Sequence, residues 1–179
     1  MQSFFHSIVR KNNLFQTRIH ISLYDTNGNG YLTEPNLKEY ISELIPTFTH
    51  LKNMEENFKE NYIVGAMKKF TFFLDPKRTG RVYIKDMLTS PILAELYELR
   101  QERYEEEVNQ NWFSIPYMKN LQNRFNKLDS DKNGTLKKED LAKYSKGLTA
   151  IVIDRIYEEY QTYDGELDYQ GFLEFVLAM

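Results

Sequence analysis

Oxygen-bearing side chains recur in this sequence at a spacing that could bind a divalent cation. A twelve-residue calcium loop uses oxygens at positions 1, 3, 5, 7, 9 and 12, with a glycine at position 6 for the sharp turn. Residues 129–140 fit this frame best, because they supply three carboxylates, an amide and a backbone carbonyl. The candidate metal ligands are Asp129, Asp131, Asn133, Thr135 and Asp140.

The residue at position 12 of this loop predicts weak binding. Asp140 stands at position 12, where a bidentate glutamate would close the strongest sites, and its shorter side chain reaches the ion less well. Lys137 stands at position 9, so we expect a water to replace a side-chain ligand there. The sequence predicts a Ca²⁺ site with an affinity of about 10⁻⁵ M or poorer and reduced selectivity over Mg²⁺, the second candidate ion.

The same frame recurs at three other glycines, Gly30, Gly80 and Gly165. An internal repeat of this kind indicates a common structural unit. The second loop, 75–86, places Lys77 at a ligand position and is predicted to be structural, and the fourth, 160–171, ends in Gly171 and cannot make a cage. The first loop, 25–36, keeps the shape with a single carboxylate, and its weaker candidate ligands are Asp25, Asn27, Asn29, Tyr31 and Asn36.

Helices must position these loops. Apolar residues recur at helical spacing before and after them, and a single apolar residue at position 8 of each loop would let two loops pair as a short strand contact. This is the EF-hand pattern. The sequence therefore predicts an all-α fold of two EF-hand-pair lobes, in which the loops pair as short strands and a longer connecting helix lies around residues 54–74.

The intervals between the loops predict the organisation of the chain. We expect an N-terminal lobe over 1–100 with two degenerate motifs, a Glu-rich linker over 101–112, and a C-terminal EF-hand pair over 113–179. The loop at 160–171 would brace its partner through Leu167 against Leu136.

Composition excludes several other functions. The 179 residues contain no cysteine, which removes thiolate catalysis and cysteine-bound metals, and three isolated histidines give no zinc or triad pattern. A net charge of −3 argues against nucleic-acid binding, and no segment is apolar enough to span a membrane. We expect a soluble, intracellular protein that is a monomer on its own and is not an enzyme.

Several stretches outside the ligand positions resemble one family. Phe72-Phe73-Leu74-Asp75-Pro76, followed by Arg78-Thr79-Gly80, and Thr162-Tyr163-Asp164-Gly165-Glu166 are far more specific than the loop consensus. Gln16–Ile19, Ser22–Asp25 and Asn111–Ser114 agree with them. From about residue 4 onward the chain resembles the EF-hand region of the B″ regulatory subunits of protein phosphatase 2A, with the gamma type and its plant TONNEAU relatives nearest.

The resemblance implies a non-catalytic subunit that joins the phosphatase scaffold and catalytic chains and responds to calcium. It also implies a cytoplasmic location, with centrosomal, cytoskeletal or nuclear association, and a metal role for the ligands of the third loop. Members of the family are longer than this chain. Two alternatives stay open: a free calcium sensor or buffer, and an EF-hand scaffold that needs no metal.

Overall fold

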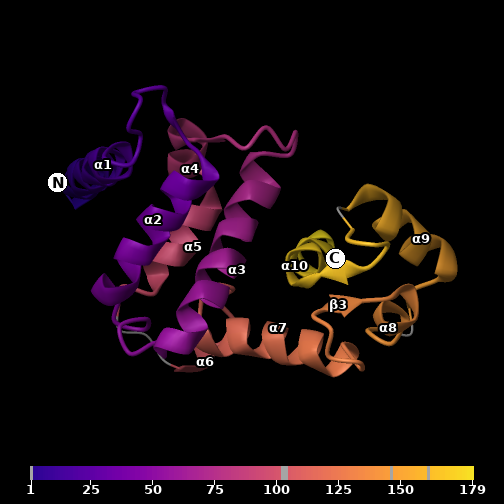
Figure 1. Cartoon of the computed structure of the whole chain (residues 1–179). Coiled ribbons are helices and arrows are strands. Elements are labelled where there is room, and N and C mark those ends of the chain that lie inside the picture. Colours follow the sequence, from indigo (N-terminus) through magenta and orange to yellow (C-terminus); the bar gives the residue numbers. More distant parts are fainter. Residues whose placement is uncertain (1, 102–104, 146, 161) are drawn as a thin grey trace. The chain divides into compact units, whose positions relative to one another are not determined.

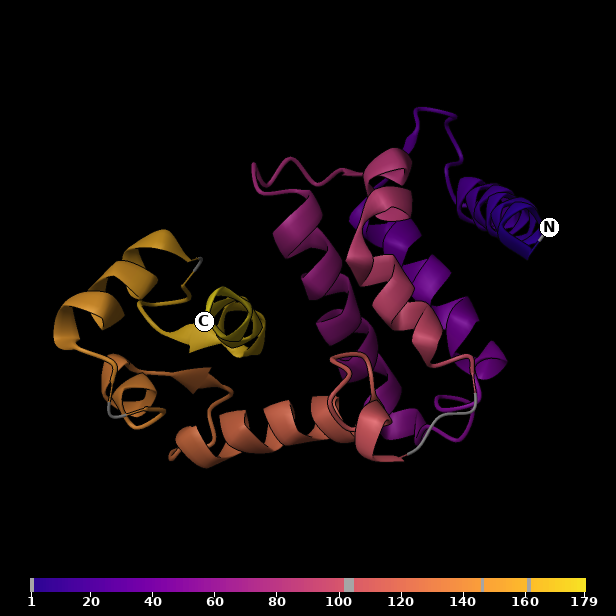
Figure 2. The same ribbon diagram turned by 180° about the vertical axis from the view of Figure 1, so that it is seen from behind.

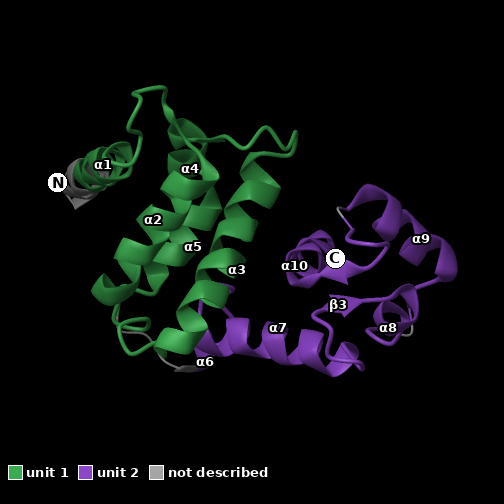
Figure 3. Cartoon of the chain, viewed as in Figure 1, with its two compact units in different colours: residues 1–104 green, residues 105–179 purple. Residues whose placement is uncertain are grey.

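The chain folds into two compact units, residues 1–104 and 105–179 (Figure 3). The computed structural model describes residues 2–101, 105–145, 147–160 and 162–179. Helices dominate both units, and each unit contains one pair of two-residue antiparallel strands (Figure 1). The predicted all-α fold with short loop–loop strand pairing is confirmed.

The division between the units falls inside the segment predicted as a linker, 101–112. Residues 102–104 of that segment lie outside the described residues. Its C-terminal part is structured, since Glu105–Val108 form the short helix α6 and both Val108 and Trp112 are buried.

The first unit holds two helix–loop–helix motifs. Its elements in chain order are α1 (Gln2–Ser22), β1 (Tyr31–Leu32), α2 (Glu34–Leu44), the 3₁₀ turn η1 (Ile45–Thr47), α3 (Glu56–Leu74), β2 (Val82–Tyr83), α4 (Ile84–Thr89) and α5 (Pro91–Glu98). The long helix predicted around 54–74 is α3. α4 ends early because Ser90 begins a new helix: its hydroxyl accepts a hydrogen bond from Ile92 N at 2.9 Å, and Pro91 occupies the first helical turn.

The apolar faces of these helices form the core of the first unit. α2 packs along α3, as the two opposite views show (Figures 1 and 2), and α1 contacts α4. Tyr40 is fully buried, and its hydroxyl lies 2.8 Å from that of Tyr97 on α5. Burying a tyrosine is favourable when its hydroxyl finds a partner, so this contact fixes α2 against α5.

The two loops of this unit pair as the sequence predicts. Leu32 lies opposite Val82 in the β1–β2 register, and both side chains are almost completely buried. The pairing continues to Ile84, whose N–H donates to the Gly30 carbonyl at 3.0 Å. Position 8 of each loop therefore ties the loops to the core and to each other.

The second unit repeats the design with shorter helices. After α6 come α7 (Ile115–Leu128), β3 (Thr135–Leu136), α8 (Lys138–Ala142), α9 (Ala150–Glu159), β4 (Leu167–Asp168) and α10 (Tyr169–Ala178). Ser114 and Asp168 cap α7 and α10 through side-chain bonds from Tyr117 N and Gly171 N. The core consists of Phe125, Leu128, Leu136, Leu141, Leu167, Phe172 and Phe175.

Gly171 lies where the backbone of α10 approaches this core. A Cβ at this position would lie 2.4 Å from Leu167 Cδ1 and 2.9 Å from its Cγ, and Leu167 is fully buried. We expect Gly171→Ala to lower the free energy of unfolding by about 1–2 kcal/mol, because overpacking costs more than the gain in helix propensity. Urea denaturation measures the change.

Gly147→Ala is the matched control. Its added Cβ would meet only Ser145 Oγ, at an ordinary 3.7 Å. Equal stabilities of the two variants would contradict the close packing of α10 on β4.

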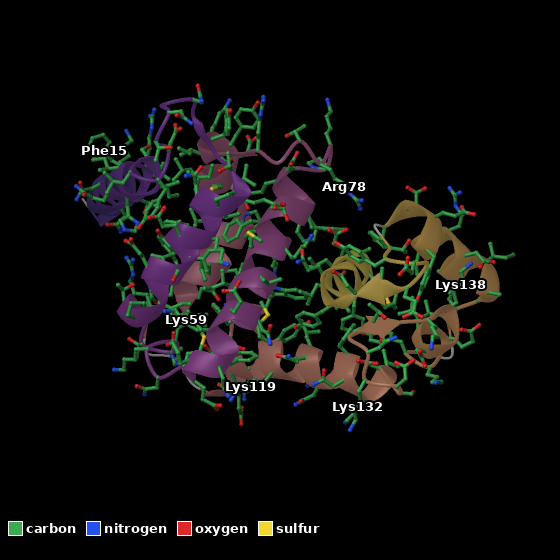
Figure 4. All side chains as sticks on the ribbon, in the orientation of Figure 1. Phe15, Lys59, Arg78, Lys119, Lys132 and Lys138 are labelled. Carbon is green, nitrogen blue, oxygen red and sulfur yellow. The ribbon has the colours of Figure 1, made fainter. Side chains whose placement is uncertain are left out.

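An open groove of about 800 Å³ lies beside the first loop, between α1 and α4. Phe15, labelled in Figure 4, lines it from α1 and is 59% exposed. No helix among the described residues has the length and apolarity needed to cross a membrane.

Candidate metal centre

The loop after α7 has the backbone form that the sequence predicts for the third loop. Lys132 at position 4 and Gly134 at position 6 both have left-handed backbones, with φ of 57° and 85°. Glycine adopts this conformation at no steric cost, which explains its place at the sharp turn. The chain then enters β3.

Asp129 holds the turn together. Its Oδ1 accepts from Asn133 N at 3.2 Å and its Oδ2 from Gly134 N at 2.9 Å, and the residue is only 8% exposed. A carboxylate that receives backbone N–H groups in this way is pre-organised at position 1 of the loop.

Asp131 at position 3 is bound to a lysine of its own loop. Lys137 Nζ lies 2.7 Å from Asp131 Oδ2, and this bond is the main cause of the lowered pKa of Asp131. The sequence suggested a water in place of a ligand at position 9, and did not foresee that the Lys137 ammonium would reach across the loop.

Asp140 at position 12 is bound to a second lysine. Lys143 Nζ lies 2.8 Å from its Oδ1, while its Oδ2 accepts from Lys137 N at 3.3 Å. The bond from Lys143 lowers the pKa of this buried carboxyl and outweighs the opposing effect of burial. The negative charge of Asp131 opposes this shift and raises the pKa of Asp140, but by less than the bond from Lys143 lowers it.

The five predicted ligands thus belong to one loop, but two of their carboxylates are turned toward lysines. Among the residues that the structure describes, no three His, Cys, Asp or Glu side chains are arranged as a ready cage for a metal ion. The donor set itself suits a hard cation, since it offers carboxylate, amide and carbonyl oxygens. A Ca²⁺ ion at this loop would have to displace the ammonium groups of Lys137 and Lys143.

Lys143→Gln is therefore expected to strengthen Ca²⁺ binding. An ion pair whose lysine is exposed, as Lys143 is, contributes about 0.2–1 kcal/mol, so removing this competitor should raise the affinity by up to about fivefold. Isothermal calorimetry with Ca²⁺ measures the effect.

Lys138→Gln serves as the control. Lys138 (Figure 4) is the first residue of α8, the helix that Lys143 follows, and its ammonium pairs with Asp154, which is not a candidate ligand, at 2.6 Å. The same gain in both variants would mean that overall charge, rather than competition at Asp140, sets the affinity.

The first loop has the same backbone scheme with fewer charges. Asp25 accepts from Asn29 N at 3.0 Å and from Gly30 N at 2.6 Å, and Asn36 Oδ1 accepts from Thr33 N at 3.3 Å. Tyr31 lies in β1 with its ring 5.1 Å from the Arg81 guanidinium carbon. The structure brings the weaker candidates Asp25, Asn29, Tyr31 and Asn36 together with Asn27 in one exposed loop, with one carboxylate among them.

The second loop is closed by its own hydrogen bonds. Asp75 is 8% exposed, and its two oxygens accept four bonds, from Thr79 N and Oγ1, Gly80 N and Arg81 N, at 2.7–3.2 Å. These bonds occupy the acceptor positions of Asp75, the carboxylate at the start of the loop. They also agree with the prediction that this loop has a structural role.

The fourth loop differs from the predicted twelve-residue frame. Tyr163 and Glu166 exchange both backbone hydrogen bonds, at 2.8 and 2.9 Å, around a two-residue turn. Asp164 and Gly165 have φ of 52° and 79°, as a type I′ hairpin requires. The Asp-Gly pair favours this tight turn over an open loop. Only the part of the fourth loop from Leu167 onward, where Leu167 pairs with Leu136, follows the prediction.

One functional candidate was missed by sequence reasoning. Glu166, at the end of this hairpin, contacts the third loop: its Oε2 accepts from Asn133 Nδ2 at 3.0 Å and from Thr135 Oγ1. The strand register could have revealed it. If Leu136 pairs with Leu167 in antiparallel strands, the preceding residue Glu166 lies opposite Lys137.

Comparison with known proteins identifies relatives of the chain. No protein-family model matches it. The gamma-type B″ regulatory subunit of serine/threonine-protein phosphatase 2A from Xenopus tropicalis is 46% identical over 181 residues, and that from Homo sapiens is 45% identical. The probable B″ regulatory subunit TON2 of Arabidopsis thaliana is 38% identical over 188 residues.

The alignments cover this chain almost completely but the relatives only in part. They include 98–100% of the chain and 39–40% of these relatives, so the chain spans about two fifths of their length. A solved PP2A PR70 holoenzyme, described as a diCa model, matches with a TM-score of 0.70 and 22% identity over 88% of this chain and 60% of that chain. The predicted resemblance to the B″ regulatory subunits is confirmed, and the structural match supports the fold.

Proposed function

From this similarity to B″ gamma subunits along the whole chain, we propose that the protein is a non-catalytic, calcium-responsive regulatory subunit of protein phosphatase 2A. In this role it binds the scaffold and catalytic subunits and directs the enzyme to its substrates. The observation that carries the proposal is the 45–46% identity over 181 residues.

The loops support a regulatory role for calcium. A single loop, 129–140, carries three carboxylates in the right frame, whereas the first has one and the second is closed on Asp75. Sensors that open on calcium generally work through paired sites, which this arrangement does not offer. Bound Ca²⁺ would supply a fixed positive charge between α7 and α8, and Asp129, Asp131, Asn133, Thr135 and Asp140 would hold it.

Association with the phosphatase tests the proposal. The chain, shown to be folded by circular dichroism, is expected to be retained by the scaffold–catalytic complex, and to a different extent in Ca²⁺ than in chelator. Failure to associate in either condition would remove the phosphatase role. Cooperative uptake of Ca²⁺ together with calcium-dependent dye binding would instead favour a free sensor.

One alternative gains support from the lysine pairs. Because Lys137 and Lys143 already neutralise Asp131 and Asp140, the third loop has a stable arrangement of charge without an ion. The chain would then be an EF-hand scaffold that needs no metal. Association with the phosphatase that is the same in Ca²⁺, Mg²⁺ and chelator, with no heat of ion binding, would favour this alternative.

A further inference from the structure

Glu166 lies outside the predicted ligand set but makes side-chain contacts with the third loop. Its Oε2 accepts from Asn133 Nδ2 at 3.0 Å and from Thr135 Oγ1, and its Oε1 lies 3.9 Å from Lys137 Nζ. The side chain is 23% exposed, so it is held largely within the protein. A carboxylate from the second motif thus touches positions 5, 7 and 9 of the loop in the first.

Two features of the backbone fix this carboxylate in place. The hairpin closes at Tyr163 and Glu166 through two backbone bonds, and β4 begins at the next residue. Leu167 then pairs with Leu136, and both are fully buried. A shift of one residue would turn Glu166 to the other face and expose Leu167, so the buried pair enforces the register.

The contact determines which end of the Asn133 amide faces the loop. A carboxylate can only accept hydrogen bonds, so Glu166 selects the Nδ2 end of the amide. Oδ1 is thereby turned back into the loop, where it accepts from Thr135 N at 2.8 Å, while the single hydroxyl proton of Thr135 goes to Glu166. Only Oδ1 can bind a cation, and a flipped amide would present N–H groups to it instead.

We propose that Glu166 is a positioning residue for the third loop: it holds Asn133 with its amide oxygen toward the cation, so that the metal centre is built from both motifs of the C-terminal unit. This inference rests on the proposed binding of Ca²⁺ to residues 129–140. It explains how a hairpin with no cage of its own contributes to ion binding in its partner. Groups of this kind, behind the direct ligands, commonly change metal affinity by about ten- to a hundredfold.

The test compares Ca²⁺ affinities by calorimetry. Glu166→Ala is expected to weaken binding about tenfold. Asp164→Asn is the matched control, because it removes the same charge from the same hairpin and asparagine tolerates the positive φ of 52°. We expect the control to stay within about twofold of the wild type, since it removes charge without touching Asn133. Equal losses in the two variants would overturn the proposal.

A second background separates positioning from simple charge attraction. In Asn133→Asp both side-chain ends are oxygens, so there is no amide to orient. Glu166→Ala should then cost no more than the Asp164→Asn control does. A tenfold loss in this background as well would show that Glu166 acts through its charge alone and would overturn the proposal.

A readout without calcium distinguishes the two proposals. In the ion-free protein, nuclear magnetic resonance should show slowed solvent exchange of the Asn133 side-chain amide protons, lost in Glu166→Ala and kept in Asp164→Asn. Wild-type protein that takes up no Ca²⁺ would overturn the proposed ion binding, and the role of Glu166 in it, even if the amide protons are protected. Unprotected amide protons would overturn the positioning of Asn133 alone.

Discussion

Asp129→Asn is expected to abolish the stabilisation of the protein by Ca²⁺. An ion that binds only the native state adds about 2.7 kcal/mol at a hundredfold excess over its Kd, or roughly 10–20 °C in melting temperature for a unit of this size. Asp129 stands at position 1, where it orders the turn through Asn133 N and Gly134 N. Replacing one oxygen by an N–H₂ group both lowers the charge and points donors at the ion.

Asp25→Asn provides a control with the same local structure. Asp25 holds position 1 of the first loop and accepts the equivalent bonds from Asn29 N and Gly30 N. The first loop lacks two of the three carboxylates, so this variant should keep the full calcium-induced shift. Melting is followed in Ca²⁺ and in chelator, so that any change in the ion-free stability cancels. Loss of the shift in Asp25→Asn alone would reverse the ranking of the loops.

Asp75→Ala is expected to lower the free energy of unfolding of the first unit by about 3 kcal/mol. The buried carboxylate accepts four hydrogen bonds, and its removal leaves three backbone N–H groups and the Thr79 hydroxyl without this acceptor. Bonds to a charged acceptor are worth about 1.5–3 kcal/mol each, and relaxation toward water recovers part of the loss. Urea denaturation at pH 7 measures it.

Asp86→Asn in the same loop is the control. Asp86 is exposed at position 12, and its replacement should change stability by about 0.5 kcal/mol or less. A comparable loss in the two variants would mean that the charge of the loop, rather than the bonds to Asp75, holds it closed.

The stabilisation by Asp75 should also depend on pH. Burial favours the neutral acid, but the bonds from Thr79, Arg81 and Gly80 prevail and hold the pKa below its ordinary 3.8. A carboxyl with a depressed folded-state pKa stabilises the protein above its unfolded pKa, and the contribution is lost as the pH falls through the folded value. Stability should therefore fall more steeply below about pH 4 in the wild type than in Asp75→Asn. If the free energy of unfolding fell equally steeply below about pH 4 in the wild type and in Asp75→Asn, this account would be contradicted.

Local patterns in the sequence were sufficient for much of the fold. The glycines at position 6 and the apolar residues at position 8 predicted the turns and the strand pairs, because glycine favours a left-handed backbone and apolar residues favour burial. The ligands of the third loop could be proposed in the same way. The Asp164-Gly165 pair is itself typical of a two-residue hairpin, but fitting this segment to the twelve-residue loop pattern led to a different prediction.

The ion pairs of the third loop were harder to predict from the sequence. Lys143 lies three residues after Asp140 in a helical turn, so this pair could have been anticipated from spacing. Lys137 reaches Asp131 only because the left-handed backbone at Lys132 and Gly134 folds the loop back on itself. An ammonium on a long flexible stem takes whichever carboxylate the backbone brings within reach, and spacing does not reveal which.

The sequence by itself determined which loop has enough carboxylates to attract a divalent cation, since charge and ligand type are properties of composition. Only the tertiary structure decided that Asp131 faces Lys137 and that Glu166 lies behind Asn133. The physical reason is that a ligand set is a matter of residue identity, whereas the partner of a side chain depends on how the backbone folds. The turn at Lys132 and Gly134 brings Lys137 to Asp131, and the β3–β4 register brings Glu166 to Asn133.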